Sequence, residues 1–146
     1  EKLMNSKFSY EEINSEVKLA IAEIVGVEHD EVLDDMSLMC DLGIDSLDLV
    51  DLLSALGKKF NVEISIGFWT EKIHAEALKI GQVGAKNTLV AISELTGLIF
   101  GENDVNSLEE ILNGPYQAWD VVRNILGSIK VKSLSCYIET KMVGVL

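Results

Sequence analysis

Apolar residues recur every three or four positions between residues 10 and 25, a spacing that places them on one face of an α-helix. Ser9 precedes this series and Glu12 lies three residues later, which is the capping-box pattern of a helix start. Gly26 is suited to end the helix. The pattern predicts a first helix from about Tyr10 to Val25, with an apolar face made of Ile13, Val17, Ala20, Ile21 and Ile24.

A second helix is predicted from about Ser46 to Lys59. Asp45 is a good N-cap, Asp48 lies three residues further on, and Gly43 can adopt the positive φ of a tight approach. Leu49 falls near the acidic side, where we expect an exposed leucine that contacts a partner. The residues expected to face the core are Leu47, Val50, Leu53, Leu56 and Phe60.

The rest of the chain also favours helices and loops. Residues 27–41 predict a long connection whose apolar side chains pin it to the core, and residues 62–68 predict a loop. The region from residue 129 to 146 fits a helix, a strand or a loosely docked tail. Further helices are expected at about 70–79, at 89–95 after a cap at Asn87-Thr88, at 105–112 and at 116–129. The expected fold class is therefore all-α.

The charge is strongly acidic and unevenly distributed. The formal net charge is −12, and no lysine or arginine occurs between Leu19 and Gly57. Nucleic acid is disfavoured as a partner because phosphate binding needs clustered cations. A protein partner with a basic surface is favoured. No apolar run is long enough to span a membrane and the start lacks a signal pattern, so we expect a soluble, cytoplasmic protein without a transmembrane segment.

Cysteine and histidine chemistry is sparse. Cys40 and Cys136 are too few for a disulfide framework, although one bridge stays open. His29 and His74 are isolated from each other and from both cysteines, so no metal site is expected.

Ser46 is the candidate for chemistry. It falls in the first turn of the second helix, where free N–H groups and the helix dipole favour a negatively charged group such as a phosphodiester. It does not resemble the nucleophile of a hydrolase, because no histidine lies within ten residues to act as its base.

The sequence Asp41-Leu42-Gly43-Ile44-Asp45-Ser46-Leu47-Asp48, followed by Val50-Asp51-Leu52 and Phe60, closely resembles the acyl carrier protein signature. In that family the serine receives 4'-phosphopantetheine. The resemblance extends back over the long loop and the first helix. It implies a four-helix bundle with a long first loop, here with additional C-terminal helices. The expected domains are an acyl carrier domain, residues 4–98, and a C-terminal extension, residues 99–146.

The resemblance implies a carrier without catalytic activity of its own, in fatty acid or specialised lipid biosynthesis. Ser46 would hold the covalent 4'-phosphopantetheine, whose thiol carries acyl groups as thioesters. The partners would be a phosphopantetheinyl transferase, enzymes with basic surfaces that transfer or use acyl groups, and the acyl chain itself. An acyl pocket is expected between the second and third helices, near Ala55 and Gly57. The residues expected to recognise partners are Asp45, Leu47, Asp48, Leu49, Val50 and Asp51.

Two features distinguish this chain, and two alternatives stay open. Lys58 and Lys59 stand where many carriers are acidic, and Phe68-Trp69-Thr70 is similar to a branch that carries very long acyl chains for lipid A.

One alternative is an acidic helical adaptor that binds basic proteins without a cofactor. The other is a carrier of polyketide or aminoacyl intermediates.

Overall fold

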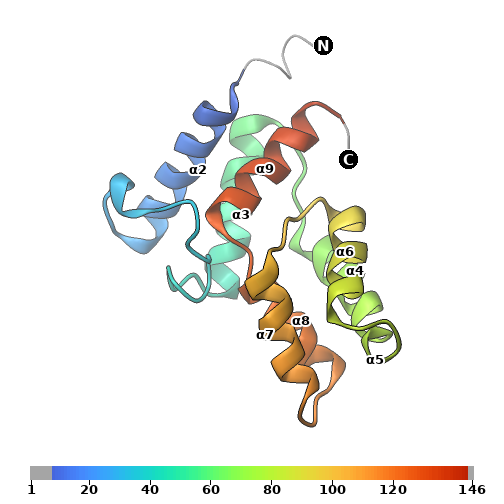
Figure 1. Cartoon of the computed structure of the whole chain (residues 1–146). Helices are drawn as coiled ribbons and strands as arrows, with labels where there is room; N and C mark the ends of the chain where they lie inside the picture. The colour runs from blue at the N-terminus through green and yellow to red at the C-terminus, as the bar shows by residue number, and fades with distance from the viewer. Residues whose placement is uncertain (1–7, 145–146) are drawn as a thin grey trace.

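The computed structural model describes residues 8–144, and within them the chain is helical (Figure 1). The only β-type pairing in this region is an isolated antiparallel bridge between Ser37 and Lys130. The predicted all-α class is confirmed, whereas residues 4–7 and 145–146 of the two predicted domains lie outside the described residues. The elements are α2 (Tyr10–Val25), the 3-10 helix η1 (His29–Glu31), α3 (Ser46–Phe60), α4 (Ile66–Ala77), α5 (Ile80–Val83), α6 (Ala85–Thr96), α7 (Glu102–Leu112), α8 (Ala118–Gly127) and α9 (Val131–Met142).

The first helix has the predicted bounds and caps. The Ser9 hydroxyl accepts from the Glu12 N–H at 3.1 Å, and the Glu12 carboxylate accepts from the Ser9 N–H at 2.8 Å. Gly26 ends α2 with φ at 78°, a left-handed conformation that glycine adopts without strain. The buried residues of α2 are Ile13, Val17, Ile21 and Ala22.

The second helix, α3, has the predicted position but a rotated apolar face. Leu49 is buried at 1% exposure, so the prediction that it contacts partners at the surface is wrong. Leu47 and Val50, which were expected in the core, are 72% and 47% exposed. The buried set is Leu49, Leu52, Leu53, Leu56 and Phe60. This set also satisfies helical spacing, so spacing alone permits either face.

Helices α4, α6 and α7 begin earlier than predicted, whereas α8 (Ala118–Gly127) lies within the predicted range 116–129. Residues 66–68 belong to α4, because the Ser65 hydroxyl accepts from the Phe68 N–H at 3.2 Å and caps the helix there. In α6 the predicted cap at Asn87-Thr88 lies inside the helix, where the Thr88 hydroxyl donates to the Gly84 carbonyl. Within the final segment, which had been left open, residues Val131–Met142 form the helix α9.

Helix α9 returns to the N-terminal part of the chain and packs against α2, which also packs against α3 (Figure 1). A polar contact marks this return: the buried Ser135 hydroxyl donates to the Asn14 side-chain oxygen at 2.6 Å. Helices α4, α6, α7 and α8 pack mainly among themselves. Part of the predicted C-terminal extension therefore lies against the first helix of the predicted carrier domain.

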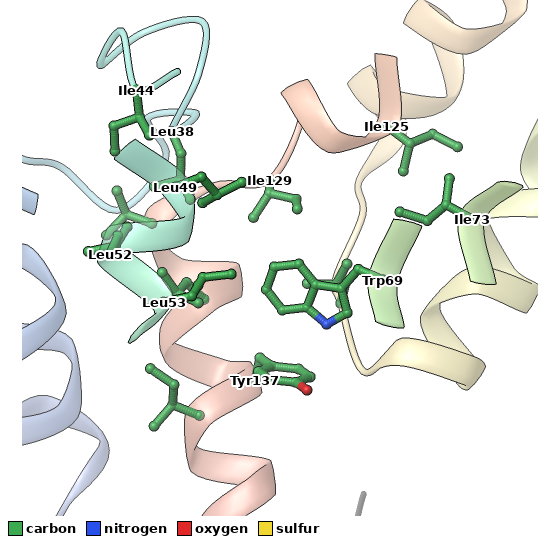
Figure 2. Packing of buried hydrophobic residues seen from close by; sticks show 14 of the residues in the cluster. Leu38, Ile44, Leu49, Leu52, Leu53, Trp69, Ile73, Ile125, Ile129 and Tyr137 are labelled. Carbon is green, nitrogen blue, oxygen red and sulfur yellow. The ribbon is translucent and has the colours of Figure 1, made fainter. Parts of the chain in front are cut away.

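The two groups of helices share a core around Trp69 (Figure 2). Leu49 of α3 and Ile129 lie on one side of its ring, and Ile73 and Ile125 lie on the other. The rings of Trp69 and Tyr137 meet edge to face, with centroids 5.1 Å apart and planes at 86°. The Trp69 Nε1 atom is buried without a hydrogen-bond partner and points toward Tyr137, an arrangement suited to a weak N–H···π contact.

Candidate functional site

The loop that leads into α3 is held by Ser37. The Ser37 hydroxyl accepts from the N–H groups of Cys40 and Asp41, at 3.1 and 2.9 Å. The Ser37 N–H donates in return to the Asp41 carboxylate at 2.9 Å. This loop therefore has a fixed shape. Sequence reasoning did not single out Ser37, although a serine four residues before an aspartate at a chain turn is a recognisable signal.

The same loop is fastened to the segment between α8 and α9. The Leu38 N–H donates to the Ile129 carbonyl at 2.9 Å, and the Val131 N–H donates to the Met36 carbonyl at 3.0 Å. The Lys132 ammonium lies 2.7 Å from the Asp35 carboxylate, which lowers the pKa of Asp35. The C-terminal part of the chain thus supports the approach to Ser46, a role for residues 129–132 that no local sequence pattern indicates.

A second anchor joins this loop to α2. The Asp34 carboxylate accepts from the Asn14 amide at 2.9 Å and pairs with the Lys18 ammonium at 3.0 Å. The hydrogen bond from Asn14, followed by that from Lys18, lowers the pKa of Asp34 below its ordinary value of 3.8. Because Asn14 also accepts from Ser135, the loop, α2 and α9 meet in one polar network.

Gly43 and Asp45 set the start of α3. Gly43 has φ at 72°, so the chain turns there through a conformation that side chains disfavour. The Asp45 carboxylate then accepts from the Asp48 N–H at 2.8 Å, and the Asp45 carbonyl accepts from the Leu49 N–H at 2.9 Å. The predicted N-cap is confirmed.

Ser46 is the first residue of α3 and is exposed. Within residues 8–144, neither its hydroxyl nor the N–H groups of Ser46 and Leu47 make a hydrogen bond to the protein. An exposed hydroxyl beside two free N–H groups at a helix start fits a phosphodiester, which carries one negative charge. The residues present therefore suit 4'-phosphopantetheine at this position.

No general base of the hydrolase kind lies in contact with Ser46 among the described residues. The ring of His29 is 3.2 Å from the Ser15 carbonyl, and the ring of His74 stacks on Trp119 with centroids 4.7 Å apart. Both histidines are thus engaged elsewhere. The part of the chain that the structure describes contains no group of three or more His, Cys, Asp or Glu side chains arranged for a metal ion.

The surface beside Ser46 combines acidic and apolar side chains. Asp45 and Asp51 are exposed and Asp48 is half-buried, while Leu47 and Val50 project from the same helix. Five of the six residues predicted to recognise partners thus reach the surface, and Leu49 does not. Leu47 and Val50 were assigned there even though helical spacing had also placed them in the core.

A hollow lies beside Gly57, where the acyl pocket was expected, and the pocket stays a prediction. Ala55 is exposed, and a Cβ atom on Gly57 would lie 2.9 Å from the Val62 carbonyl oxygen. A side chain at Gly57 would therefore collide with the loop that follows α3. The hollow has a volume of about 550 Å³ and is lined by Gly57 and other residues of α3 and by residues 61–64 of the following loop.

Comparison with known proteins agrees with this geometry. The family described as "Phosphopantetheine attachment site" matches residues 15–68, which run from α2 through the loop and α3 into α4. An acyl carrier protein from Thermotoga maritima is 46% identical over 56 residues, covering 38% of this chain and 69% of that protein. The chain belongs to the acyl carrier protein family. No solved structure matches it.

Membership of the acyl carrier protein family confirms the predicted class of protein and its covalently attached 4'-phosphopantetheine. Family membership also favours the carrier role over the alternative of an acidic adaptor that has no cofactor. The family match ends at residue 68, so the greater part of α4 and all of α5 to α9 lie beyond it. No helix in residues 8–144 combines the length and apolar character that crossing a membrane requires.

Proposed function

We propose that Ser46 is the residue that receives 4'-phosphopantetheine and that the chain carries acyl intermediates on this group. The observation that supports the proposal best is the position of Ser46, exposed at the start of α3 and inside the matched region. When attached, the group supplies a terminal thiol that holds an acyl group as a thioester. The protein's own contribution is to present the serine and bind the enzymes that act on the cargo.

Several features of the loop and helix start favour this role. Ser37 and the pairing with residues 129–131 hold the approach rigid, so the Ser46 hydroxyl points outward from a fixed position. Free N–H groups at the helix start would stabilise the negatively charged linkage by roughly 0.3–1 kcal/mol. We assign the chain no catalytic activity of its own, as expected of a carrier protein.

The partner surface that we propose consists of Asp45, Leu47, Asp48, Val50 and Asp51 on α3. Its carboxylates would attract a basic surface over a distance, and the two apolar side chains would bury area in the complex. This combination fits a phosphopantetheinyl transferase and enzymes of acyl transfer and lipid biosynthesis. A role in fatty acid or specialised lipid biosynthesis stays a prediction, and a polyketide or aminoacyl cargo stays an alternative. A cytoplasmic location also stays a prediction.

In place of two consecutive domains, we propose a carrier bundle of α2, α3 and α9 with α4–α8 inserted between its second and last helix. Support comes from the contact of α9 with α2 and from the pairing of residues 129–132 with the loop before α3. The inserted helices pack mainly on one another, as an insertion would.

Intact mass spectrometry tests the attachment residue. The protein is incubated with coenzyme A and a broad-specificity phosphopantetheinyl transferase, and we expect a gain of one phosphopantetheinyl group. The variant Ser46→Ala should gain none, whereas Ser54→Ala, which alters another exposed serine of α3, should be modified like the parent. Modification of folded Ser46→Ala, or no modification of folded parent protein, would refute the proposal.

A further inference from the structure

A groove lies between α6 and α7, and none of its lining residues belongs to α3. Its volume is about 800 Å³. Five apolar side chains line it, and two of them, Val90 and Ile99, are 49% and 44% exposed. We call this surface the α6/α7 groove; it is lined by Lys86, Leu89, Val90, Ser93, Glu94, Ile99, Phe100, Gly101, Glu102, Val105, Asn106 and Glu109.

Contacts from α9 and from the residue before it hold the walls of the groove in place. The Ile99 carbonyl accepts from the Ser133 hydroxyl of α9 at 3.1 Å, and Asp104 of α7 lies 3.9 Å from the Lys130 ammonium. Asp104 also accepts from the Gly101 N–H at 2.8 Å, which closes the start of α7. These contacts hold the walls in place before a ligand binds. Binding would therefore cost little free energy for ordering the site.

The charge of the rim indicates what could occupy the groove. Glu94, Glu102 and Glu109 all line it, and none of them forms an ion pair within residues 8–144. Lys86 is the single cation among the lining residues. Apolar side chains framed by unpaired carboxylates complement a ligand that has an apolar face and positive charges beside it.

We propose that the α6/α7 groove binds an amphipathic helix of a partner protein, with an apolar face flanked by lysine or arginine. Helices that lie in a groove are a recurrent mode of protein recognition. The walls, α6 and α7, are 12 and 11 residues long, so a partner helix of about 12 residues, roughly 18 Å, matches them.

Other occupants fit less well. A second copy of this chain has the same net charge of −12 and would bring acidic residues toward an acidic rim. A bare acyl chain would cover the apolar side chains of the groove. It would leave the carboxylates of Glu94, Glu102 and Glu109 partly desolvated without a counter-charge. The groove thus provides a second attachment surface, which does not depend on the proposed modification of Ser46.

Fluorescence anisotropy tests the proposal on the full-length chain. The probe is a fluorescein-labelled peptide of leucine and lysine, with the leucines along one face of a helix of about 12 residues. The first control peptide has the same composition with the leucines spread around the helix. The second replaces every lysine with glutamate. We expect the amphipathic basic peptide to bind at least about tenfold more tightly than either control, and to bind Ser46→Ala as well as the parent.

Matched protein variants locate the binding. The double variant Glu94→Lys/Glu109→Lys alters the groove, whereas Glu23→Lys/Glu71→Lys makes the same change in net charge on exposed residues of α2 and α4. The groove variant should weaken binding by about tenfold and the control by less than about threefold. Circular dichroism checks that both variants are folded. Equal losses, equal binding of the scrambled peptide, or a parent dimer that the groove variant converts to monomer would each overturn the proposal.

Discussion

The strongest test of the architecture is the substitution Ile138→Ala in α9. Ile138 is fully buried at 0% exposure, one turn beyond Ser135, whose hydroxyl bonds to α2. The substitution removes three carbon atoms, which corresponds to about 2.4 kcal/mol of lost burial at roughly 0.8 kcal/mol each. The cavity left behind adds to this loss, so we expect the free energy of unfolding to fall by about 3 kcal/mol. The midpoint of thermal unfolding should fall by roughly 6–12 °C.

The assay follows urea unfolding by circular dichroism and by the NMR amide signals of Val17 in α2 and Leu49 in α3. Because α9 is part of the bundle, both signals should be lost at the same lowered urea concentration as the helical signal. The matched control is Val143→Ala, which removes an exposed side chain just after α9 and should change stability by less than about 0.5 kcal/mol. If Ile138→Ala melted α9 while the midpoints of Val17 and Leu49 stayed unchanged, α9 would be an appendage and our description of the bundle would be wrong.

Two further predictions concern the loop before α3. Gly43→Ala should destabilise the protein by about 1–2 kcal/mol, measured by urea unfolding, because φ is positive there although the added Cβ meets no atom within 4 Å. Gly101→Ala, where a Cβ is equally free of contacts but φ is −116°, is the control, and equal losses would contradict the explanation. Asp34→Asn should be less stable than the parent at neutral pH, because the pKa of Asp34 is lowered in the folded state. The difference should shrink as the pH falls below the ordinary value of 3.8 and through the lowered value. Asp30→Asn in the exposed η1 is the control, and a parent-to-Asp34→Asn difference that persists in acid would refute this account.

Local signals were sufficient where one side chain decides the structure. Ser9 and Glu12 defined the start of α2, Gly26 its end, and Asp45 the start of α3, because each makes a hydrogen bond or a backbone turn within a few residues of itself. The same logic would have placed the start of α4, since Ser65 is followed three residues later by the N–H group that it caps.

The apolar face of α3 could not be chosen by spacing alone. Leucine or valine occupies six of the ten positions from Leu47 to Leu56, so two overlapping stripes both fit a helical period. The choice between them depends on where α2 and residue Ile129 lie, which is tertiary information. As a result Leu47 and Val50 were assigned to the core and Leu49 to the surface, the reverse of what the structure shows.

The position of α9 was beyond prediction for a related reason. Its contact with α2 joins Ser135 to Asn14, residues 121 positions apart, and no pattern within either helix names the other. The loop and helix start around Ser46 were nevertheless predictable, because the residues that form them are mostly contiguous. Only their support from residues 129–132 depends on the return of the chain.

The packing of α9 on α2 has a consequence for synthesis on the ribosome. Helix α2 is made before α9, and the helix that covers part of its apolar face follows only after residues 26–130 have been added. At about 5–20 residues per second, that delay is roughly 5–20 s. During this interval the nascent chain exposes apolar surface that the finished protein buries. The early part of the protein is therefore an expected client for chaperones that bind nascent chains.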